Sequence, residues 1–383
     1  MIVGWPVAAQ PDPNAPGGVP MRAPPPSVQL GPLRATTTWL HRNLFSSISN
    51  GLLTILAVAG FVELVVPFLR WAVFGATVHG TSQAACTGDG ACWTFIRLRL
   101  PTLLYGHYPV GQTWRVDLAA LLLAVFCVPV LRLRTRRRGR WLVLLLTLYP
   151  ALACWLLLGG VSPLPYADPD LWGGLMLNVI ITVLVTTLAM PVGILLALGR
   201  QSPLPVIRGF SVWYIEFWRG LPLLGVLFVS AVMAPLFLPQ GVSVSRLLRA
   251  VAAMSLFNAA YFAEIVRGGL QSVAAGQYEA AVSIGLRSWQ VNLLIILPQA
   301  LRQAIPGLVN TVIDLFKDTT LISIIGLFDL LGSVSQALRD PAWLGLAKEG
   351  FTFAALVFFV CCFAISLYSR GVERKLAHRR PGH

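Results

Sequence analysis

The sequence predicts an all-α, polytopic membrane protein with about eight transmembrane helices. Of its 383 residues, 56% are hydrophobic and only 11% are charged, and the mean hydropathy is +0.73. A soluble domain has no core large enough to hide that much apolar surface. Apolar runs of about 20 residues also recur along the chain, which is the length that a helix needs to cross a hydrocarbon layer of roughly 30 Å.

The apolar runs give the expected spans in chain order. The second run is the shortest, and the seventh is the least regular because Asp314, Lys317 and Asp318 interrupt it. The eight runs lie at residues 51–69, 116–131, 141–160, 173–198, 221–238, 249–266, 303–328 and 351–369.

Basic residues between the runs predict the topology. Residues 132–140, RLRTRRRGR, hold six arginines between the second and third runs, and short basic loops stay on the cytoplasmic side of a membrane. Alternation then places the N-terminus, the stretch 200–219 and the C-terminal tail in the cytoplasm as well. This topology explains the formal net charge of +14, so no nucleic-acid partner is expected.

Composition divides the chain into four parts. Residues 1–34 are rich in Pro, Gly and Ala, which predicts a disordered tail, and they lack the continuous apolar core of a signal peptide. Residues 35–172 are expected to form an N-terminal extension with three spans and a periplasmic loop. Residues 173–369 are expected to form a five-helix core, and residues 370–383 a basic cytoplasmic tail.

The six cysteines fall into two groups. Cys86 and Cys92 bracket a short glycine-containing turn in the first outer loop, where an oxidising compartment permits a disulfide. Two free thiols are the alternative. No second ligand pair follows, so no zinc or other metal site is expected. The other four lie in apolar runs, where a cysteine behaves as a small buried hydrophobe; they are Cys127, Cys154, Cys361 and Cys362.

The most informative stretch is the polar interruption at residues 276–298, between the sixth and seventh runs. Residues 277–284 are good helix formers, and their two small alanines would let a partner backbone approach closely. Gly285 supplies a stop, because glycine takes left-handed dihedrals at little steric cost. Pro298 is expected to kink the chain where it re-enters the membrane.

The spacing within this stretch resembles the EAA loop of ATP-binding-cassette (ABC) importer permeases. The resemblance implies a coupling helix that docks on a cytoplasmic ATPase, which would bind ATP and Mg²⁺. This chain has no G-x-x-x-x-G-K-[ST] phosphate-binding loop, so the energy would come from that partner. An ordinary amphipathic loop is the alternative. The matching residues are Glu279, Ala280, Ala281, Gly285, Ile295, Leu297 and Pro298.

A second motif precedes the fifth run. Residues 214–227, YIEFWRGLPLLGVL, resemble the ExxRGxPL signature of the polar amino acid permeases, with Glu216, Arg219, Gly220 and Pro222 in place. The likeness implies a MetI-like type I importer core. Further features narrow the resemblance to the larger permease of the general L-amino acid transporter. They are the three-span extension, the outer cysteine pair and the strings FKDT and GLFDLLG. It further implies a second, different permease subunit, a periplasmic amino-acid binding protein and a bacterial inner membrane.

Polar residues inside spanning runs are costly in lipid and are candidates for the substrate path. The sharpest pair is Lys317 beside Asp318, because a zwitterionic amino acid needs one group for its carboxylate and one for its ammonium. A helix broken near Thr319 would add backbone dipoles. Alternatively, the two charges pair with each other or face water at a helix end. The candidates are Asn178, Asn258, Glu264, Lys317, Asp318 and Thr319.

Two other classes of function compete with an ATP-driven importer subunit for L-amino acids. A self-sufficient secondary transporter or channel needs an inverted repeat and membrane-buried ion ligands, neither of which the sequence displays clearly. A membrane enzyme needs a catalytic constellation, yet the five histidines stand without paired carboxylates. The sequence therefore favours a non-catalytic permease subunit.

Overall fold

The structure is a computed structural model that describes residues 39–377, except residues 133–137, 162, 238, 240 and 242. Within that part the chain is helical, and its only β-type pairing consists of isolated bridges. The chain divides into two compact units, residues 1–70 and residues 71–383. The tail expected to be disordered, residues 1–34, and the last six residues of the basic tail lie outside the described residues.

The described part of the first unit contains one long apolar helix, α2 (Ile48–Leu69). Ser47 caps the start of this helix, because its hydroxyl accepts a hydrogen bond from the backbone N–H of Asn50. None of its residues is buried within the chain. A helix that is apolar on all sides and this long fits a membrane span rather than the surface of a soluble domain.

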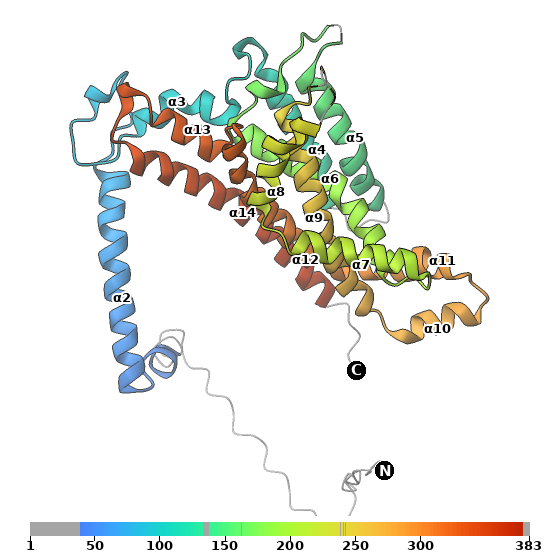
Figure 1. Ribbon diagram of the computed structural model, residues 1–383. Helices are drawn as coiled ribbons and strands as arrows, with labels where there is room; N and C mark the ends of the chain where they lie inside the picture. The colour runs from blue at the N-terminus through green and yellow to red at the C-terminus, as the bar shows by residue number, and fades with distance from the viewer. Residues whose placement is uncertain are drawn as a thin grey trace, which may run out of the picture. The chain divides into compact units, whose positions relative to one another are not determined.

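In the second unit, α4 (Trp114–Arg132) and α5 (Arg138–Leu158) form a helical hairpin. Aromatic rings join the two helices, since the ring centre of Phe126 lies 6.1 Å from the ring centres of both Trp141 and Tyr149. The second helix of the hairpin also contacts α6 (Gly174–Arg200). This contact attaches the hairpin to the helices that follow it in the chain (Figure 1).

The centre of the second unit is the pair of α6 and α9 (Arg246–Gln271). α12 (Leu297–Asp318) packs against α9, and α14 (Ala347–Ala377) packs against α12 (Figure 1). Gly193 permits the close approach of α6 to α9. A Cβ atom at this position would lie 2.7 Å from Phe262 Cβ and 2.9 Å from the carbonyl oxygen of Ala259.

Five described helical stretches are long and apolar enough to cross a membrane, and a sixth is added if α7 (Pro205–Arg219) and Leu223–Phe237, bent by 96°, form one broken span. Judged by length and composition, the described helices therefore give five or six spans, whereas eight were predicted. α9 and α12 fall short because they carry many polar side chains, although at 1.5 Å per residue they are about 39 and 33 Å long. The five stretches are Ile48–Phe74, Val110–Val130, Gly139–Leu158, Gly174–Arg200 and Ala347–Gly371.

A disulfide-bonded loop and a short helix, α3 (Trp93–Tyr105), lie beside α13 (Leu330–Ala337) and the start of α14 (Figure 1). The sulfur atoms of Cys86 and Cys92 are bonded, with their Cα atoms 5.6 Å apart. The backbone N–H of Cys92 donates to Glu349 Oε1 at 3.2 Å. We name this arrangement the outer clasp; its further contacts are an ion pair between Arg99 and Asp340 and a bond from Gln83 to the Leu344 carbonyl.

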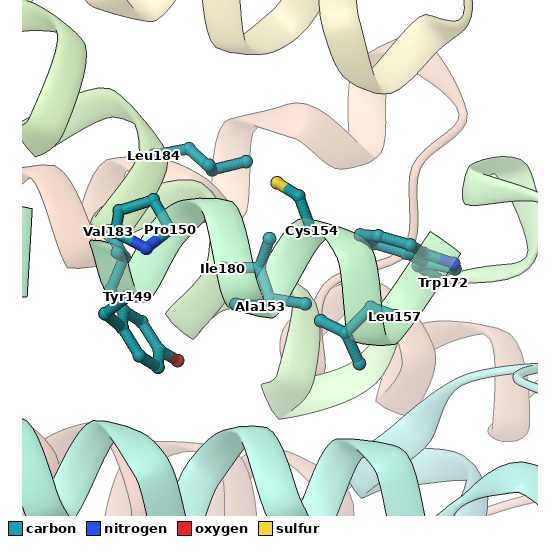
Figure 2. A pocket seen from close by; sticks show the side chains of 9 residues that line it. All are labelled: Tyr149, Pro150, Ala153, Cys154, Leu157, Trp172, Ile180, Val183 and Leu184. Atoms are coloured by element: carbon teal, nitrogen blue, oxygen red, sulfur yellow. The ribbon is translucent and has the colours of Figure 1, made fainter. Parts of the chain in front are cut away.

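An apolar cavity lies between α5 and α6 (Figure 2). Its lining contains no charged side chain, so it does not suit a zwitterionic amino acid. Cys154 is among the lining residues, and the four cysteines predicted to be buried are in fact half-buried. The lining residues are Tyr149, Pro150, Ala153, Cys154, Leu157, Trp172, Ile180, Val183 and Leu184.

Replacing Gly193 by Ala should destabilise the protein, because the added methyl group forces α6 and α9 apart. Overpacking of this kind costs about 1 to 3 kcal/mol. The matched control is Gly268→Ala on α9, where a Cβ would meet no atom within 4 Å and alanine is the better helix former. Thermal unfolding in detergent should give a lower midpoint for Gly193→Ala only; equal midpoints would contradict the close approach.

Candidate functional site

The predicted coupling loop begins with α10 (Ala275–Ser283), which ends in a Schellman motif at Gly285. The backbone N–H of Gly285 donates to the Val282 carbonyl at 2.9 Å, and that of Leu286 donates to the Ala281 carbonyl at 3.3 Å. Gly285 has φ +83°, a conformation that residues with a Cβ rarely adopt. This confirms the predicted left-handed stop.

Four large apolar side chains of the loop are exposed. Tyr278 and Val282 stand one helical turn apart and are 43% and 49% exposed, while Ile284 and Trp289 nearby are 75% and 57% exposed. Large apolar side chains that remain exposed on a loop between long helices are typical of a protein-docking surface. We name these four residues the docking patch.

The residues that carry the EAA resemblance divide between the surface and the interior. Glu279, Ala280 and Gly285 are exposed. Ala281 is only 3% exposed and belongs to the core of the chain itself, where half-buried Leu286 also packs. The expectation that a partner approaches both alanines is therefore wrong for Ala281, because the helix turns that side chain inward.

The second half of the loop leads back into the helical bundle. α11 (Ser288–Gln290) is followed by the π-helical turn Val291–Ile296 and then by α12. Ile295 and Leu297 are half-buried and pack against the core. Pro298 is exposed and directly follows the π-helical turn, which runs without a break into α12; prolines and π-helical turns both accompany helix kinks.

The signature residues form the sharp bend between α7 and α8 (Leu223–Phe228). α7 ends at Arg219, and the N–H of Gly220 donates to the carbonyls of Glu216 and Phe217 at 3.0 and 3.2 Å. Pro222 then precedes the first residue of α8. A proline at this point cannot continue the preceding helix and is well placed to start a new one.

An ion cluster joins the C-terminal parts of α6, α7 and α9. Arg200 at the end of α6 donates to Glu264 on α9 at 2.8 Å, and Arg267 on α9 donates to both oxygens of Glu264 at 2.8 to 3.2 Å. Arg219 on α7 lies 3.8 Å from Glu264, and Arg200 also bonds to Glu216 at 3.2 Å. We name these five residues the inner ion cluster.

Glu264 is the hub of this cluster. Its side chain is 15% exposed, whereas the side chain of Glu216 is 56% exposed. A carboxylate that accepts bonds from several guanidinium groups is held in place and neutralised. Among the predicted path residues, Glu264 therefore acts as a tie between α6, α7 and α9 in this structure.

Two other predicted path residues meet in a buried network. Asn178 on α6 donates to Thr319 Oγ1 at 2.7 Å and to Asp329 Oδ2 at 3.0 Å, and its side-chain oxygen accepts from the N–H of Leu330 at 3.0 Å. Asn178, Thr319 and Asp329 are all fully buried. Burial raises the pKa of the Asp329 carboxyl, although hydrogen bonds to Gly332 and Asn178 oppose that shift. These partners leave Asn178 committed to holding three segments together.

Asp314 and Lys317 near the end of α12 are exposed, and Lys317 does not pair with Asp318. Lys317 pairs with Asp314, one turn earlier, at 3.3 Å, because neighbouring residues such as Lys317 and Asp318 point to different sides of a helix. The side chains of Asp314 and Lys317 are 69% and 55% exposed. The helix ends at Asp318 and 3₁₀ turns follow over Thr319–Ile325, which confirms the predicted break.

Asn258 is the last of the predicted path residues. It is 4% exposed within α9, and its side chain donates to the carbonyl of Met254 in its own helix at 2.9 Å. The structure therefore brings Asn178 and Thr319 together, and it places Glu264 and Lys317 in two separate charge clusters. Sequence reasoning missed Arg200 and Asp329, because each lies far in the sequence from the residue that it contacts. Arg200 contacts Glu264, and Asp329 contacts Asn178.

Comparison with known proteins identifies the family. Residues 189–378 match the model of the binding-protein-dependent transport system inner membrane component. An inner membrane amino-acid ABC transporter permease protein of Escherichia coli K12 is 49% identical over 345 residues, which cover 90% of this chain and 94% of that protein. The chain belongs to the amino-acid ABC transporter permeases. As a member of this family it is a non-catalytic membrane subunit of an import system.

Other relatives differ in how much of this permease they match. The glutamate/glutamine/aspartate/asparagine transport system permease protein of Rhodobacter capsulatus is 38% identical, covering 92% of this chain and 95% of its own length. The glutamate/aspartate import permease protein of Escherichia coli O157:H7 is 36% identical over 57% of this chain and 96% of its own. A crystal structure of an amino acid ABC transporter with histidines is 30% identical, covers 53% of this chain and 92% of its own, and has a TM-score of 0.48.

Replacing Glu264 by Gln should destabilise the permease far more than replacing Glu216 by Gln. The first change removes the anion that Arg200, Arg219 and Arg267 share, and an uncompensated charge in a partly buried site costs about 3 kcal/mol. The second breaks one exposed pair worth at most about 1 kcal/mol. Thermal unfolding of the two variants in detergent tests this, and similar midpoints would show that Glu264 is not the hub.

Replacing Asn178 by Ala should destabilise the permease by about 1 to 3 kcal/mol for each buried group left without a partner. Those groups are the N–H of Leu330 and one oxygen of Asp329. Asn258→Ala is the matched control, because it removes a bond only to a carbonyl within its own helix. A chemical denaturation series that ranks the two variants in the opposite order would contradict the structural role of Asn178.

Proposed function

We propose that this permease works with a cytoplasmic ATPase to carry L-amino acids across the bacterial inner membrane, and that α10 is its coupling helix. The observation that carries the proposal is the docking patch. It is an apolar surface on a short, rigidly ended helix, in a chain without a phosphate-binding loop of its own. ATP and Mg²⁺ would bind to the partner.

The route from the partner to the membrane is short. Three residues, 272–274, separate the end of α9 from the start of α10, so movement of α10 pulls on α9. The inner ion cluster ties the same end of α9 to α6 and α7. Closure of the ATPase would therefore shift three helices together, and alternation between two states needs only a few kcal/mol of differential binding.

The exposed charges of α12 support a place for the substrate path. Asp314 and Lys317 would be expensive in lipid, so their side of α12 faces water or another protein. We place the path along that side, between this chain and a second, different permease subunit, with Asp318 and the helix break at its edge. A periplasmic binding protein would deliver the amino acid.

The proposed topology has eight spans and both termini in the cytoplasm. α9 and α12 supply the two spans that composition alone does not detect. α9 is enclosed by α6, α7, α8 and α12, and a helix that other helices cover can keep polar side chains at membrane depth.

The function is tested by replacing Gly285 with Val and, as the matched control, Gly276 with Val. Both positions have open space for a Cβ, but only Gly285 has a positive φ. The strained residue should distort the end of α10. In cells that express the complete system, Gly285→Val should lose uptake of labelled L-amino acids at least about tenfold, as a few kcal/mol of lost coupling predicts. Gly276→Val should retain it.

The same membranes give the second measurement. Wild-type chain and Gly276→Val should co-purify with an ATPase, whereas Gly285→Val should reach the membrane at a normal level without it. Two outcomes would overturn the proposal. One is uptake by Gly285→Val at the wild-type rate. The other is active transport by the purified chain alone in liposomes, which would identify a self-sufficient transporter.

A further inference from the structure

α7 carries a stripe of large apolar side chains that remain exposed. Val206, Phe210, Trp213 and Phe217 are 81%, 58%, 59% and 45% exposed. Their spacing of four, three and four residues places them on one side of the helix. The rings contact one another. Those of Trp213 and Phe217 are stacked with their centres 5.3 Å apart, and the ring centre of Phe210 lies 6.2 Å from that of Trp213. We name these four residues the aromatic face.

The opposite side of α7 is charged. At 100° per residue, Arg208 lies about 180° around the helix from Phe217. Arg208, Glu216 and Arg219 are all exposed, and they give the helix a net charge of +1 from two arginines and one glutamate. Ile215 is seven residues, or two turns, after Arg208 and so lies on nearly the same side, where Ser211 and Ile215 are buried against the rest of the chain. The helix is therefore apolar on one side, and its charged residues flank the packed surface on the other.

α7 differs in direction from the apolar stretch that follows it, and it is too short to cross a bilayer by itself. Its 15 residues are about 22 Å long, less than the roughly 30 Å of a hydrocarbon core. It also lies at 96° to the apolar stretch Leu223–Phe237 that follows it. If that stretch runs into the membrane, α7 runs along the membrane surface.

We propose that α7 lies in the headgroup region of the cytoplasmic leaflet, with its aromatic face toward the acyl chains and its charged side toward the cytosol. A tryptophan within an exposed apolar face, on a helix that carries arginines elsewhere, matches the chemistry of that region. The exposed apolar surface also continues past the bend through Leu221 and Leu224 to Phe228, which are 36%, 45% and 52% exposed. The net positive charge suits anionic headgroups. This location does not depend on the transport function.

Site-directed spin labelling of the full-length chain tests the proposal. The four half-buried cysteines are replaced by Ala, the Cys86–Cys92 disulfide is retained, and a nitroxide is attached to Trp213→Cys or to Arg208→Cys. The two positions lie on opposite sides of α7, and both are exposed, so both labels should be tolerated. A label at Leu195, 68% exposed on α6, serves as the reference for a membrane-facing side chain.

The measurement is the collision rate of each nitroxide with oxygen, which concentrates in lipid, and with a water-soluble nickel complex. It is made in vesicles of phosphatidylethanolamine and phosphatidylglycerol. The ratio of oxygen to nickel collisions at position 213 should exceed that at position 208 several-fold and should approach that at position 195. A label at Phe217→Cys, on the same face, should give the same result.

Two results would overturn the proposal. Low collision rates with both reagents at positions 213 and 217 would mean that a protein, such as a second permease, covers the aromatic face. Equal ratios at positions 213 and 208 would mean that the aromatic face is in water. If a labelled variant fails to fold, quenching of the Trp213 fluorescence by brominated lipid, taken as the difference from Trp213→Phe, decides the same question.

Discussion

Polar groups have no water to bond with inside a bilayer, and this constraint accounts for the arrangement of the second unit. The central polar side chains Asn178 on α6 and Glu264 on α9 both bond to other segments of the chain. Asn178 meets Thr319, Asp329 and the N–H of Leu330, and Glu264 meets the arginines of three helices. These bonds fix which helix faces adjoin, because a rotation of either helix would leave a polar group without a partner.

The same constraint explains why polar residues in spanning runs are ambiguous as indicators of function. A polar side chain at membrane depth can contact a transported solute, or it can hold two helices together. Asn178, Thr319 and Glu264 hold helices together in this structure. Asp314 and Lys317 remain exposed, although they neutralise each other. The two roles are distinguished by how buried the side chain is and by what it bonds to. Neither burial nor bonding can be read from the residue type.

Local features were predictable from the sequence. The stop at Gly285 depends on backbone sterics within a few residues, and so does the helix break near Thr319. The long apolar runs at α2, α4, α5, α6 and α14 are also local, since span length follows from bilayer thickness. The family resemblance rested on short motifs of the same kind, at α10 and at the bend after α7.

Features that depend on distant contacts were not predictable. Arg200 and Glu264 are 64 residues apart, so nothing in either neighbourhood announces the pair. α3 and α7 were missed because each is shorter than a span and carries charges, which makes it resemble a loop. Ala281 was expected at a partner surface, but α10 turns its side chain into the core of the chain itself. Composition alone does not settle the number of spans, because α9 and α12 carry polar side chains and pack against other helices.

The outer clasp has a consequence for the order in which the protein is built. The N–H of Cys92 and the carboxylate of Glu349 are 257 residues apart, and the ribosome makes the cysteine loop long before the last helix. The bond from Cys92 to Glu349 therefore cannot form until the start of α14 has been made. Closing this contact is a late step of biogenesis, and the ion pair of Arg99 also waits for Asp340, which is made 241 residues later.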